Sequence, residues 1–451
     1  MKVVHSLGWY FPDTTGGTEV YVSQLVKELH KQGIDGVIAA ARDGYQNDTY
    51  SHEGIEVFRY PVHPSPSQQQ LRGLVPYGGF DQFVSWLSKQ NADIYHQHSM
   101  VGGCGIHHLE AARKLGLRTV VTVHLPGTIC LRGSMMLYGS SACDGHVETV
   151  RCGVCWAMSK GLTYPLAAVC GHLPKSISRP FAKKEGPLSA SLATPTIVET
   201  HLSQLQKLSV LADRTIAISN WLYEALIANG FPPDKLVLCQ TGIVRKQVAT
   251  NAKASIDPGP LRVGFLGRLV KEKGIDILIN AFKRLPCEVD ITLSIYGINS
   301  DDKSYEQKLQ RLAKTDPRIN FKDPIAPENS MDTLRLFDLV AIPSQFLETG
   351  PLVALEAHQA QIPVLASNLG GLAERIRNGI DGLLVPAGDE KAWSEALLRL
   401  ATNRKLLGEL KRGIRPIRSM GEVAGEMVNV YEALINHPTT HVSESAPLVC
   451  A

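Results

Sequence analysis

The chain has 451 residues, which is enough for two domains of ordinary size, and its 44% hydrophobic and 20% charged residues are typical of a folded globular protein. The 46 Lys and Arg against 43 Asp and Glu give a formal net charge of +3, which does not favour nucleic acid or an anionic membrane as a general partner. No apolar run reaches the ~20 residues that a membrane-spanning helix needs. The polar first residues do not resemble a signal peptide, so we expect a cytoplasmic protein with reduced cysteines.

Short apolar strands alternate with amphipathic helices along the first half of the chain, a pattern that predicts a parallel α/β sheet. The expected strands cover residues 2–6, 36–41, 93–98, 119–124, 213–219 and 235–238, and the expected helices cover 19–32 and 198–212. Residues 125–205 interrupt the alternation and contain four clustered cysteines, so we expect an insertion there. The first domain, with this insertion, is expected to span residues 1–250.

The alternation restarts after a polar linker at 247–260 and predicts a second α/β domain over residues 260–420. The expected strands cover 262–266, 290–296, 339–342, 363–366 and 382–385, and the expected helices cover 274–285, 305–314, 351–359 and 391–436. A C-terminal helix and a polar tail are expected over 421–451. Two successive α/β units of this size indicate two Rossmann-like domains that face a cleft.

The most informative stretch follows a predicted strand and carries two glutamates, Glu348 and Glu356. Pro351 suits the first position of a helix, and the free amides of Leu352 and Val353 would then bind an anion such as a pyrophosphate. Eight residues of helix separate two side chains by ~12 Å, which exceeds the ~5–9.5 Å of a glycosidase carboxylate pair. We therefore expect the two glutamates to bind two ends of one long ligand. The alternative is a helix-capping Glu348 and a solvated Glu356.

Further candidates lie where other predicted strands end. Arg268 and Lys273 follow a glycine-rich strand end, and two fixed cations there suit a diphosphate that gains negative charge as it leaves. Lys271, between them, is better explained as a surface charge. In the first domain, Gly16 and Gly17 follow the first strand and would let the backbone approach a ligand closely.

In this order and spacing, the motifs resemble the retaining nucleotide-sugar glycosyltransferases of family 4, which have the GT-B fold. The resemblance runs from residue 1 to about 435, and its strongest motif is the Glu-x7-Glu element formed by Glu348 and Glu356. The other matching segments are 95–99, 121–124, 212–219, 267–274, 362–367, 370–374 and 382–386. The expected fold class is therefore α/β of the GT-B type, with a Cys-rich insertion in the N-terminal domain.

The resemblance implies a role for each matched residue of the second domain. Arg268 and Lys273 would bind the diphosphate of a nucleoside-diphosphate sugar. Glu356 would bind the ribose hydroxyls, and Glu348 would bind hydroxyls of the donor sugar. The amides of the turn and helix start would approach the phosphates; they belong to Gly350, Leu352 and Val353.

The first domain would face the same ligand from the other side. By the same resemblance, Gly16 and Gly17 would approach the phosphates, and His124 would lie at the reacting face of the sugar. The chain departs from the family pattern at Gln361, where glycine is usual, and also at His358 and Gln359. We expect these three side chains on the back of their helix, away from the donor.

The resembling enzymes transfer the sugar with retention of configuration, and the usual proposal for them is front-face attack. In that mechanism a phosphate oxygen takes the proton of the acceptor hydroxyl, so the protein must stabilise charge and position the acceptor. The sequence contains no Asp-x-Asp element for a metal. We therefore expect catalysis that requires no divalent cation.

Four of the nine cysteines are clustered, and they are Cys130, Cys143, Cys152 and Cys155. Four thiolates that end in a C-x2-C pair suit a structural, tetrahedral zinc ion in a reduced compartment. Free buried thiols, a disulfide and an iron–sulfur cluster are the alternatives. The histidines at 96, 98, 107 and 108 are expected to occupy ordinary strand-end and helix positions rather than a metal site. A subset of the resembling enzymes carries a similar insertion, which would overhang the acceptor side.

Three other functions compete with a transferase. A nucleotide-sugar 2-epimerase would use the same fold without an acceptor. A dinucleotide-dependent dehydrogenase would need a Gly-x-Gly-x-x-Gly element after a strand, and the glycines at 16–17 and 264–267 do not fit it. A zinc-dependent interaction module on a degenerate transferase is the third. The donor base, the sugar and the acceptor stay open; the acceptor would be a glycan, a lipid-linked glycan or a small molecule, with peripheral membrane contact allowed.

Overall fold

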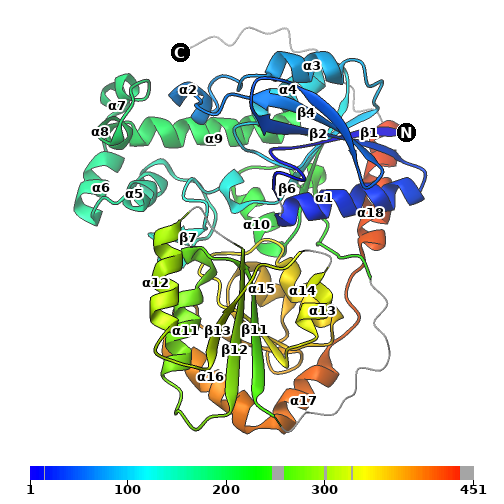
Figure 1. The fold of residues 1–451 in the computed structure, drawn as a ribbon. Helices are drawn as coiled ribbons and strands as arrows, with labels where there is room; N and C mark the ends of the chain where they lie inside the picture. Colours follow the sequence, from blue (N-terminus) through cyan, green and yellow to red (C-terminus); the bar gives the residue numbers. More distant parts are fainter. Residues whose placement is uncertain (15, 246–258, 299–301, 327–328, 437–451) are drawn as a thin grey trace.

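The computed structural model describes residues 1–14, 16–245, 259–298, 302–326 and 329–436. The chain forms two α/β domains, each built on its own parallel sheet, with the second domain below the first in Figure 1. This arrangement confirms the expected pair of Rossmann-like domains. Most of the predicted linker at 247–260 and the predicted polar tail from 437 onward lie outside the described residues.

The sheet of the first domain has eight strands in the order β10-β9-β6-β5-β1-β2-β4-β3, and only the β3–β4 pair is antiparallel. Its strands are β1 (Lys2–Leu7), β2 (Asp35–Asp43), β3 (Asp48–His52), β4 (Ile55–Val62), β5 (Ile94–Gln97), β6 (Arg118–Val123), β9 (Arg214–Ala217) and β10 (Leu236–Leu238). Central strands are buried on both faces, as in β5, where all four residues are buried. A parallel sheet needs helices on both faces, and the apolar runs of these strands fit that burial.

The helices of the first domain include a compact group that the insertion contributes. The helices are α1 (Gly17–Lys31), α2 (Gln68–Leu71), α3 (Phe80–Leu87), α4 (Ile106–Lys114), α5 (Thr149–Ser159), α6 (Tyr164–Gly171), α7 (Lys175–Phe181), α8 (Pro187–Leu192), α9 (Thr194–Leu211) and α10 (Asn220–Ala228). The short helices η1 (Pro126–Thr128) and η2 (Pro233–Lys235) and the ribbon β7 (Met136–Leu137) and β8 (Ser141–Ala142) complete it. Figure 1 shows α5 to α8 at one end of the domain, so the insertion extends the first domain sideways.

The second sheet has six parallel strands in the order β13-β12-β11-β14-β15-β16. They are β11 (Leu261–Arg268), β12 (Ile291–Ile298), β13 (Ile319–Lys322), β14 (Leu339–Ile342), β15 (Val364–Ser367) and β16 (Gly382–Val385). The covering helices are α11 (Ile275–Lys283), α12 (Lys303–Ala313), α13 (Ser330–Leu334), α14 (Leu352–Gln359), α15 (Gly370–Arg375), α16 (Glu390–Thr402) and α17 (Arg404–Gly413), with η3 (Lys271–Lys273). No described helix is both long and apolar enough to cross a membrane.

The last described helix, α18 (Met420–Asn436), returns to the first domain and packs beside α1 (Figure 1). Its apolar residues share one buried cluster with Leu25 and Val26 of α1. The hydroxyl of Tyr431 lies 2.6 Å from Nδ1 of the buried His96, which joins the end of the chain to the central strand β5. The helical region expected over 391–436 consists of α16, α17 and α18, and α17 ends at Gly413 before a stretch that contains Pro416.

The antiparallel hairpin of β3 and β4 was not predicted. Strand β3 consists of the polar residues 48–52 and carries no apolar alternation, because it is an edge strand with mostly exposed side chains. Strand β4 ends with Pro61 and Val62, and a proline in a run weakens a strand prediction. The hairpin turns at Glu53 and Gly54, both with positive φ.

The contact between Tyr431 and His96 gives a test of how α18 is fixed. Tyr431→Phe removes the hydroxyl and leaves a buried imidazole nitrogen without its partner, so the free energy of unfolding should fall by ~1–3 kcal/mol. Urea unfolding of both proteins measures this change. The control is Tyr45→Phe, since Tyr45 is 73% exposed and its change should stay within ~0.5 kcal/mol. Equal losses in the two variants would contradict a fixing role for Tyr431.

Candidate functional site

A cavity of about 450 Å³ lies between the two domains, within the size range of ligand pockets. The first domain lines it with the start of α1, and the second domain lines it with the end of β11 and the start of α14. The predicted residues that it brings together are Gly16, Gly17, Leu352, Val353 and Glu356. The approach is close, because a Cβ atom on Gly17 would lie 3.6 Å from the side chain of Leu352.

Helix α14 presents its N-terminus to this cavity. The sequence predicted Pro351 as the first helical residue. In the structure the helix begins one residue later, at Leu352, and Pro351 is its N-cap. The one-residue difference leaves the predicted role of the Leu352 and Val353 amides unchanged, because both residues still form the first turn. The positive end of the helix dipole therefore points at the cavity, a common arrangement for anion binding.

Lys273 and Glu348 contact each other directly. The Lys273 Nζ atom lies 2.6 Å from Oε1 of Glu348, and Ser344 Oγ donates a second hydrogen bond of 2.6 Å to the same oxygen. Lys273 Nζ also lies 5.2 Å from the centre of the Phe346 ring. Both hydrogen bonds fall on Oε1 of a carboxylate that is only 8% exposed. These two contacts hold the carboxylate in one orientation. Among the described residues they engage Oε1, and Oε2 can accept a hydrogen bond from a further partner.

Arg268 and Gly350 lie outside the lining of the cavity. Arg268 is the last residue of β11 and is exposed, and within the described residues it forms no ion pair; its neighbour Gly267 lines the cavity. Gly350 packs against the first domain, where a Cβ atom would lie 2.8 Å from the Thr241 side chain. A side chain at position 350 would therefore separate the two domains.

The loop that carries Glu348 is bound to the first domain by its backbone and side chains. The amide of Leu347 donates to the carbonyl of Ser134 at 3.1 Å, in the insertion. Thr349 Oγ1 donates to the carbonyl of His124 at 2.6 Å. The Leu347 side chain is 5% exposed and belongs to the main apolar cluster of the first domain. The structure is therefore in a closed arrangement of the two domains.

A second set of contacts between the domains comes from α15. The carboxylate of Glu374 accepts hydrogen bonds from the backbone amides of Asn220 at 2.8 Å and Trp221 at 2.7 Å. These amides begin α10, so a residue of one domain caps a helix of the other. Burial lowers the pKa of the neighbouring Arg375 to about 10, and its Nη2 donates to Thr241 Oγ1 at 2.5 Å. The sequence contained Glu374 in a family segment but gave no signal of this capping contact.

His124 directly follows β6 and lies next to the loop that carries Glu348, because its carbonyl accepts the hydrogen bond from Thr349 Oγ1. Its ring is 6% exposed, and the ring of Tyr21 meets it edge-on with 4.7 Å between the ring centres. The Nε2 atom lies 3.2 Å from Nδ1 of His98. Burial lowers the pKa of His124 to about 3, so the imidazole is neutral throughout the physiological range.

The structure corrects one expectation about the family departures. Gln359 was expected on the back of its helix, but it lines the cavity and its Nε2 donates to the carbonyl of Val244 at 3.1 Å. His358 was also expected to point away from the donor. It does not line the cavity, and its Nε2 lies 3.2 Å from the carbonyl of Asp381 in the second domain. Gln361 has a φ of 60°, a left-handed conformation that explains why a glycine is usual there.

The four clustered cysteines surround one small hollow of about 30 Å³. Two of their sulfurs accept backbone hydrogen bonds, Cys152 from the amide of Glu148 at 3.4 Å and Cys155 from the amide of Tyr138 at 3.2 Å. No three of the four sulfurs lie within 4.8 Å of one another. Among the described residues, the only group of three potential metal-ligand atoms within that distance belongs to His5, His96 and His98. A zinc ion bound by thiolates at ~2.3 Å would need the sulfurs to lie closer.

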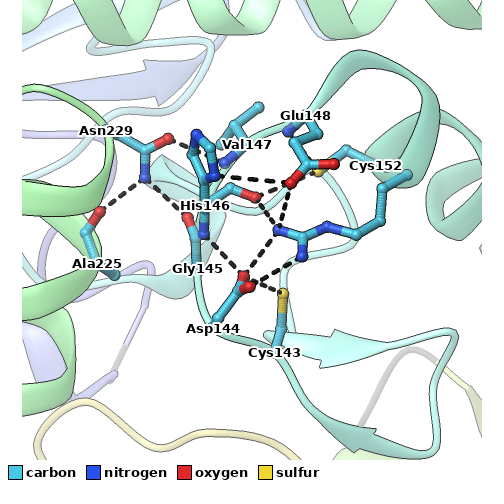
Figure 2. A network of polar contacts seen from close by, with 10 residues as sticks. Cys143, Asp144, Gly145, His146, Val147, Glu148, Cys152, Ala225 and Asn229 are labelled. Atoms are coloured by element: carbon cyan, nitrogen blue, oxygen red, sulfur yellow. Dashed lines mark hydrogen bonds and ion pairs between the residues drawn. The ribbon is translucent and has the colours of Figure 1, made fainter.

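The loop between Cys143 and Cys152 is held to the body of the first domain (Figure 2). Asn229, which directly follows α10, accepts from the amide of Val147 at 3.0 Å and donates to the carbonyl of Gly145 at 2.7 Å. Within the loop, the Arg151 guanidinium donates two hydrogen bonds of 2.8 Å to Asp144. The cysteine cluster is therefore tied to α10, the helix that Glu374 of the other domain caps.

Comparison with known proteins agrees with this geometry. Residues 16–171 match the model of a "Glycosyl transferase 4-like domain", and residues 248–415 match that of "Glycosyl transferases group 1". The D-inositol 3-phosphate glycosyltransferase of Rhodococcus erythropolis is 31% identical over 236 residues, 49% of this chain and 53% of its own length. That of Corynebacterium glutamicum is 37% identical over 145 residues, 31% of this chain and 34% of its own length. The chain thus spans about half the length of the first of these relatives.

Solved structures match the whole fold. The Anabaena HepE protein, in complex with UDP and glucose, has a TM-score of 0.62 at 15% identity, and the match covers 97% of this chain and 98% of that one. The sucrose-phosphate synthase of Thermosynechococcus elongatus has a TM-score of 0.66 at 18% identity, covering 96% of this chain and 99% of its own. Two Rossmann-like domains around a cleft lined in this way define the GT-B class. Within that class, the chain belongs to glycosyltransferase family 4.

The capping contact of Glu374 gives a test of the closed arrangement. Glu374→Ala removes a carboxylate that accepts from two amides of the other domain, so the closed state should lose ~0.5–2 kcal/mol relative to the open one. Small-angle X-ray scattering should then report a larger radius of gyration. Glu432→Ala, on the exposed side of α18, is the matched control. Superimposable scattering curves for the two variants would argue against this contact.

Proposed function

We propose that the protein transfers a sugar from a nucleoside-diphosphate sugar to an acceptor hydroxyl, with retention of configuration. The observation that supports this most is the cavity between the domains. It combines the glycines at 16 and 17, the N-terminus of α14 and Glu356, and the Lys273–Glu348 pair lies on the adjoining loops. A diphosphate would meet the backbone amides of the α14 start there, with Lys273 on an adjoining loop.

We propose uridine as the donor base, since the solved HepE protein of the same fold binds UDP. Arg268 and Lys273 would bind the diphosphate with the amides of the α14 start, and Glu356 would bind the ribose. Glu348 would offer Oε2 to the hydroxyls of the donor sugar, since Oε1 is already engaged by Lys273 and Ser344.

The neutral state of His124 limits its role in the reaction. A buried imidazole with a pKa of about 3 is a poor proton acceptor, so the proton of the acceptor hydroxyl would go to a phosphate oxygen of the leaving group. The departing diphosphate gains negative charge, which Arg268, Lys273 and the α14 dipole would stabilise. These groups would supply the charge stabilisation that a divalent cation supplies elsewhere, so we propose a reaction that does not require one.

We propose that the acceptor binds in a second cavity of about 340 Å³ in the first domain. Its walls are the segment from Gln70 to Pro76, the start of α4, η1 and one face of α9. The insertion thus contributes a wall, through Trp156 of α5 and residues such as His201 of α9. An insertion in this position would shape the choice of acceptor.

Arg268 and Lys271 provide a matched test of the donor site. Arg268→Met removes an exposed cation that forms no ion pair among the described residues, so the ligand-free protein should melt as before while UDP binds ~10–100-fold more weakly. Lys271→Met, an exposed neighbour assigned to the surface, should bind UDP like the parent protein. Thermal shifts in a series of UDP, GDP, ADP, TDP and CMP measure both the affinity and the base preference. No shift with any nucleotide, or equal loss in both variants, would contradict the proposed donor site.

We further propose that the four cysteines bind a structural zinc ion, in the reduced cytoplasm. The four cysteines line one hollow, and the sulfurs of Cys152 and Cys155 already accept backbone N–H groups. Burial raises the pKa values of the Cys143 and Cys152 thiols, so zinc must displace protons to bind. Rotation of the side chains toward the hollow would be needed to bring the sulfurs to ligand distance.

Metal analysis tests the zinc site directly. The purified protein should contain roughly one zinc ion per chain, and Cys152→Ser should lose it and melt at a lower temperature. Cys287→Ser, which changes an exposed cysteine of the second domain, should retain the metal. Because binding releases protons, zinc should be lost as the pH falls.

A chelator should lower the melting temperature but leave the turnover of the folded protein intact. Far less than one zinc per chain would refute the site, and turnover abolished by EDTA in the folded protein would refute metal-independent catalysis.

A further inference from the structure

Three buried histidines form a hydrogen-bonded chain that ends at His124. His5 lies on β1, His98 follows β5, and His124 follows β6, and these three strands are neighbours in the first sheet. His5 Nδ1 lies 3.0 Å from His98 Nε2, and His98 Nδ1 lies 3.2 Å from His124 Nε2. His5 and His98 are fully buried, while His124 is 6% exposed. The chain therefore runs from the interior of the sheet to the edge that faces the second domain.

All three imidazoles are neutral. Burial lowers the pKa of His5 and of His124 to about 3, and it lowers the pKa of His98 well below its usual value, with further lowering by its histidine neighbours. The aromatic neighbours of the chain are His96 and Tyr21, and neither brings a negative charge. A neutral imidazole has one N–H donor and one acceptor nitrogen. Each of the two contacts in the chain must therefore contain one proton.

Only two arrangements of the protons satisfy both contacts. In one, every N–H lies on Nδ1, so that His5 donates to His98 and His98 donates to His124. In the other, every N–H lies on Nε2 and the direction is reversed. The second arrangement puts an N–H on His5 Nε2, which is buried and has no hydrogen-bond partner. A buried N–H without an acceptor is rarer and less favourable than an unpaired lone pair, so the first arrangement is preferred.

We infer that His5 and His98 fix His124 in the tautomer that carries its proton on Nδ1, so that His124 presents an N–H donor to the cleft. Nδ1 of His124 makes no hydrogen bond within the described structure, and it is not among the buried polar atoms that lack a partner. It thus keeps some exposed area, on a residue that is 6% exposed overall. On the proposed function, this N–H would donate to an oxygen of the bound sugar, and His5 and His98 act as positioning residues.

A metal site is the competing explanation, because potential ligand atoms of His5, His96 and His98 lie within 4.8 Å of one another. Both nitrogens of His96 already have partners, with Nδ1 2.6 Å from the Tyr431 hydroxyl and Nε2 2.7 Å from Thr122 Oγ1. The His5–His98 contact likewise uses one nitrogen of each ring. A metal would have to break these contacts, so the structure favours the hydrogen-bonded chain.

The test is an NMR spectrum of the ligand-free full chain labelled with ¹⁵N at histidine, in which long-range ¹H–¹⁵N correlations identify the protonated nitrogen of each ring. We expect His5, His98 and His124 all to carry their protons on Nδ1. The His124 proton should exchange with solvent faster than the His98 proton. A proton on Nε2 of any of the three, or a metal bound by His5, His96 and His98, would overturn the inference. The spectrum does not depend on transferase activity, so it is independent of the proposed function.

Two variants at position 98 separate the chain from the local surroundings of His124. His98→Phe removes the donor to Nε2, so His124 should populate both tautomers. His98→Asn keeps an N–H that can donate to Nε2 and should restore the Nδ1 form. His63→Phe, at an exposed histidine, is the control and should leave His124 unchanged. An unaltered His124 in a folded His98→Phe protein would overturn the inference, and if that variant does not fold, the parent spectrum decides.

Discussion

The site depends on one constraint: the loop that carries Glu348 must be bound to both domains at once. Its backbone continues from β14 of the second sheet, yet Leu347 is buried in the apolar cluster of the first domain. The Glu348 carbonyl accepts hydrogen bonds from Gly371 of its own domain at 2.7 Å and from the Trp221 indole of the other at 3.0 Å. The backbone of Glu348 is therefore held by contacts with both domains, while Lys273 and Ser344 of the second domain orient its carboxylate.

The same constraint links regions that are distant in the sequence. Helix α10 is capped by Glu374 from the second domain, and Asn229, at the other end of that helix, holds the loop of the cysteine cluster. Ser134, in the insertion, accepts the amide of Leu347. The insertion is thus in contact with the donor-side loop and also forms a wall of the 340 Å³ cavity. A structural metal in the insertion would therefore stabilise the position of that loop as well as the insertion itself.

Much of the fold followed from the sequence because the buried parallel strands are short apolar runs. The predicted strands at 339–342 and 382–385 coincide with β14 and β16, and the two-domain GT-B architecture is confirmed. The polar edge strand β3 was missed, because an exposed edge imposes no apolar pattern. Five residues that the sequence nominated in the two domains line the cavity together, since strand ends and helix starts of parallel sheets meet at one edge.

The contacts that the sequence could not give are those between side chains of different elements. Lys273 and Glu348 were assigned separate roles, and nothing in their spacing of 75 residues indicated that they form an ion pair. Gln359 lines the cavity because the direction of a side chain depends on how the helix is rotated against the other domain. The histidines at 5 and 98 carried no motif that joined them to His124. Such contacts depend on tertiary packing, which a local pattern does not encode.

The charges of the site are divided between the two domains in a way that suits front-face transfer. The groups with permanent positive charge, Arg268 and Lys273, belong to the second domain, whereas His124 of the first domain is buried and neutral. A neutral donor can approach a sugar oxygen without competing for the proton of the acceptor. The most basic group near the reacting centre would then be the diphosphate itself, and its basicity rises as the bond to the sugar breaks. Burial of His124 therefore favours proton transfer to the leaving group, which is the step that the proposed mechanism requires.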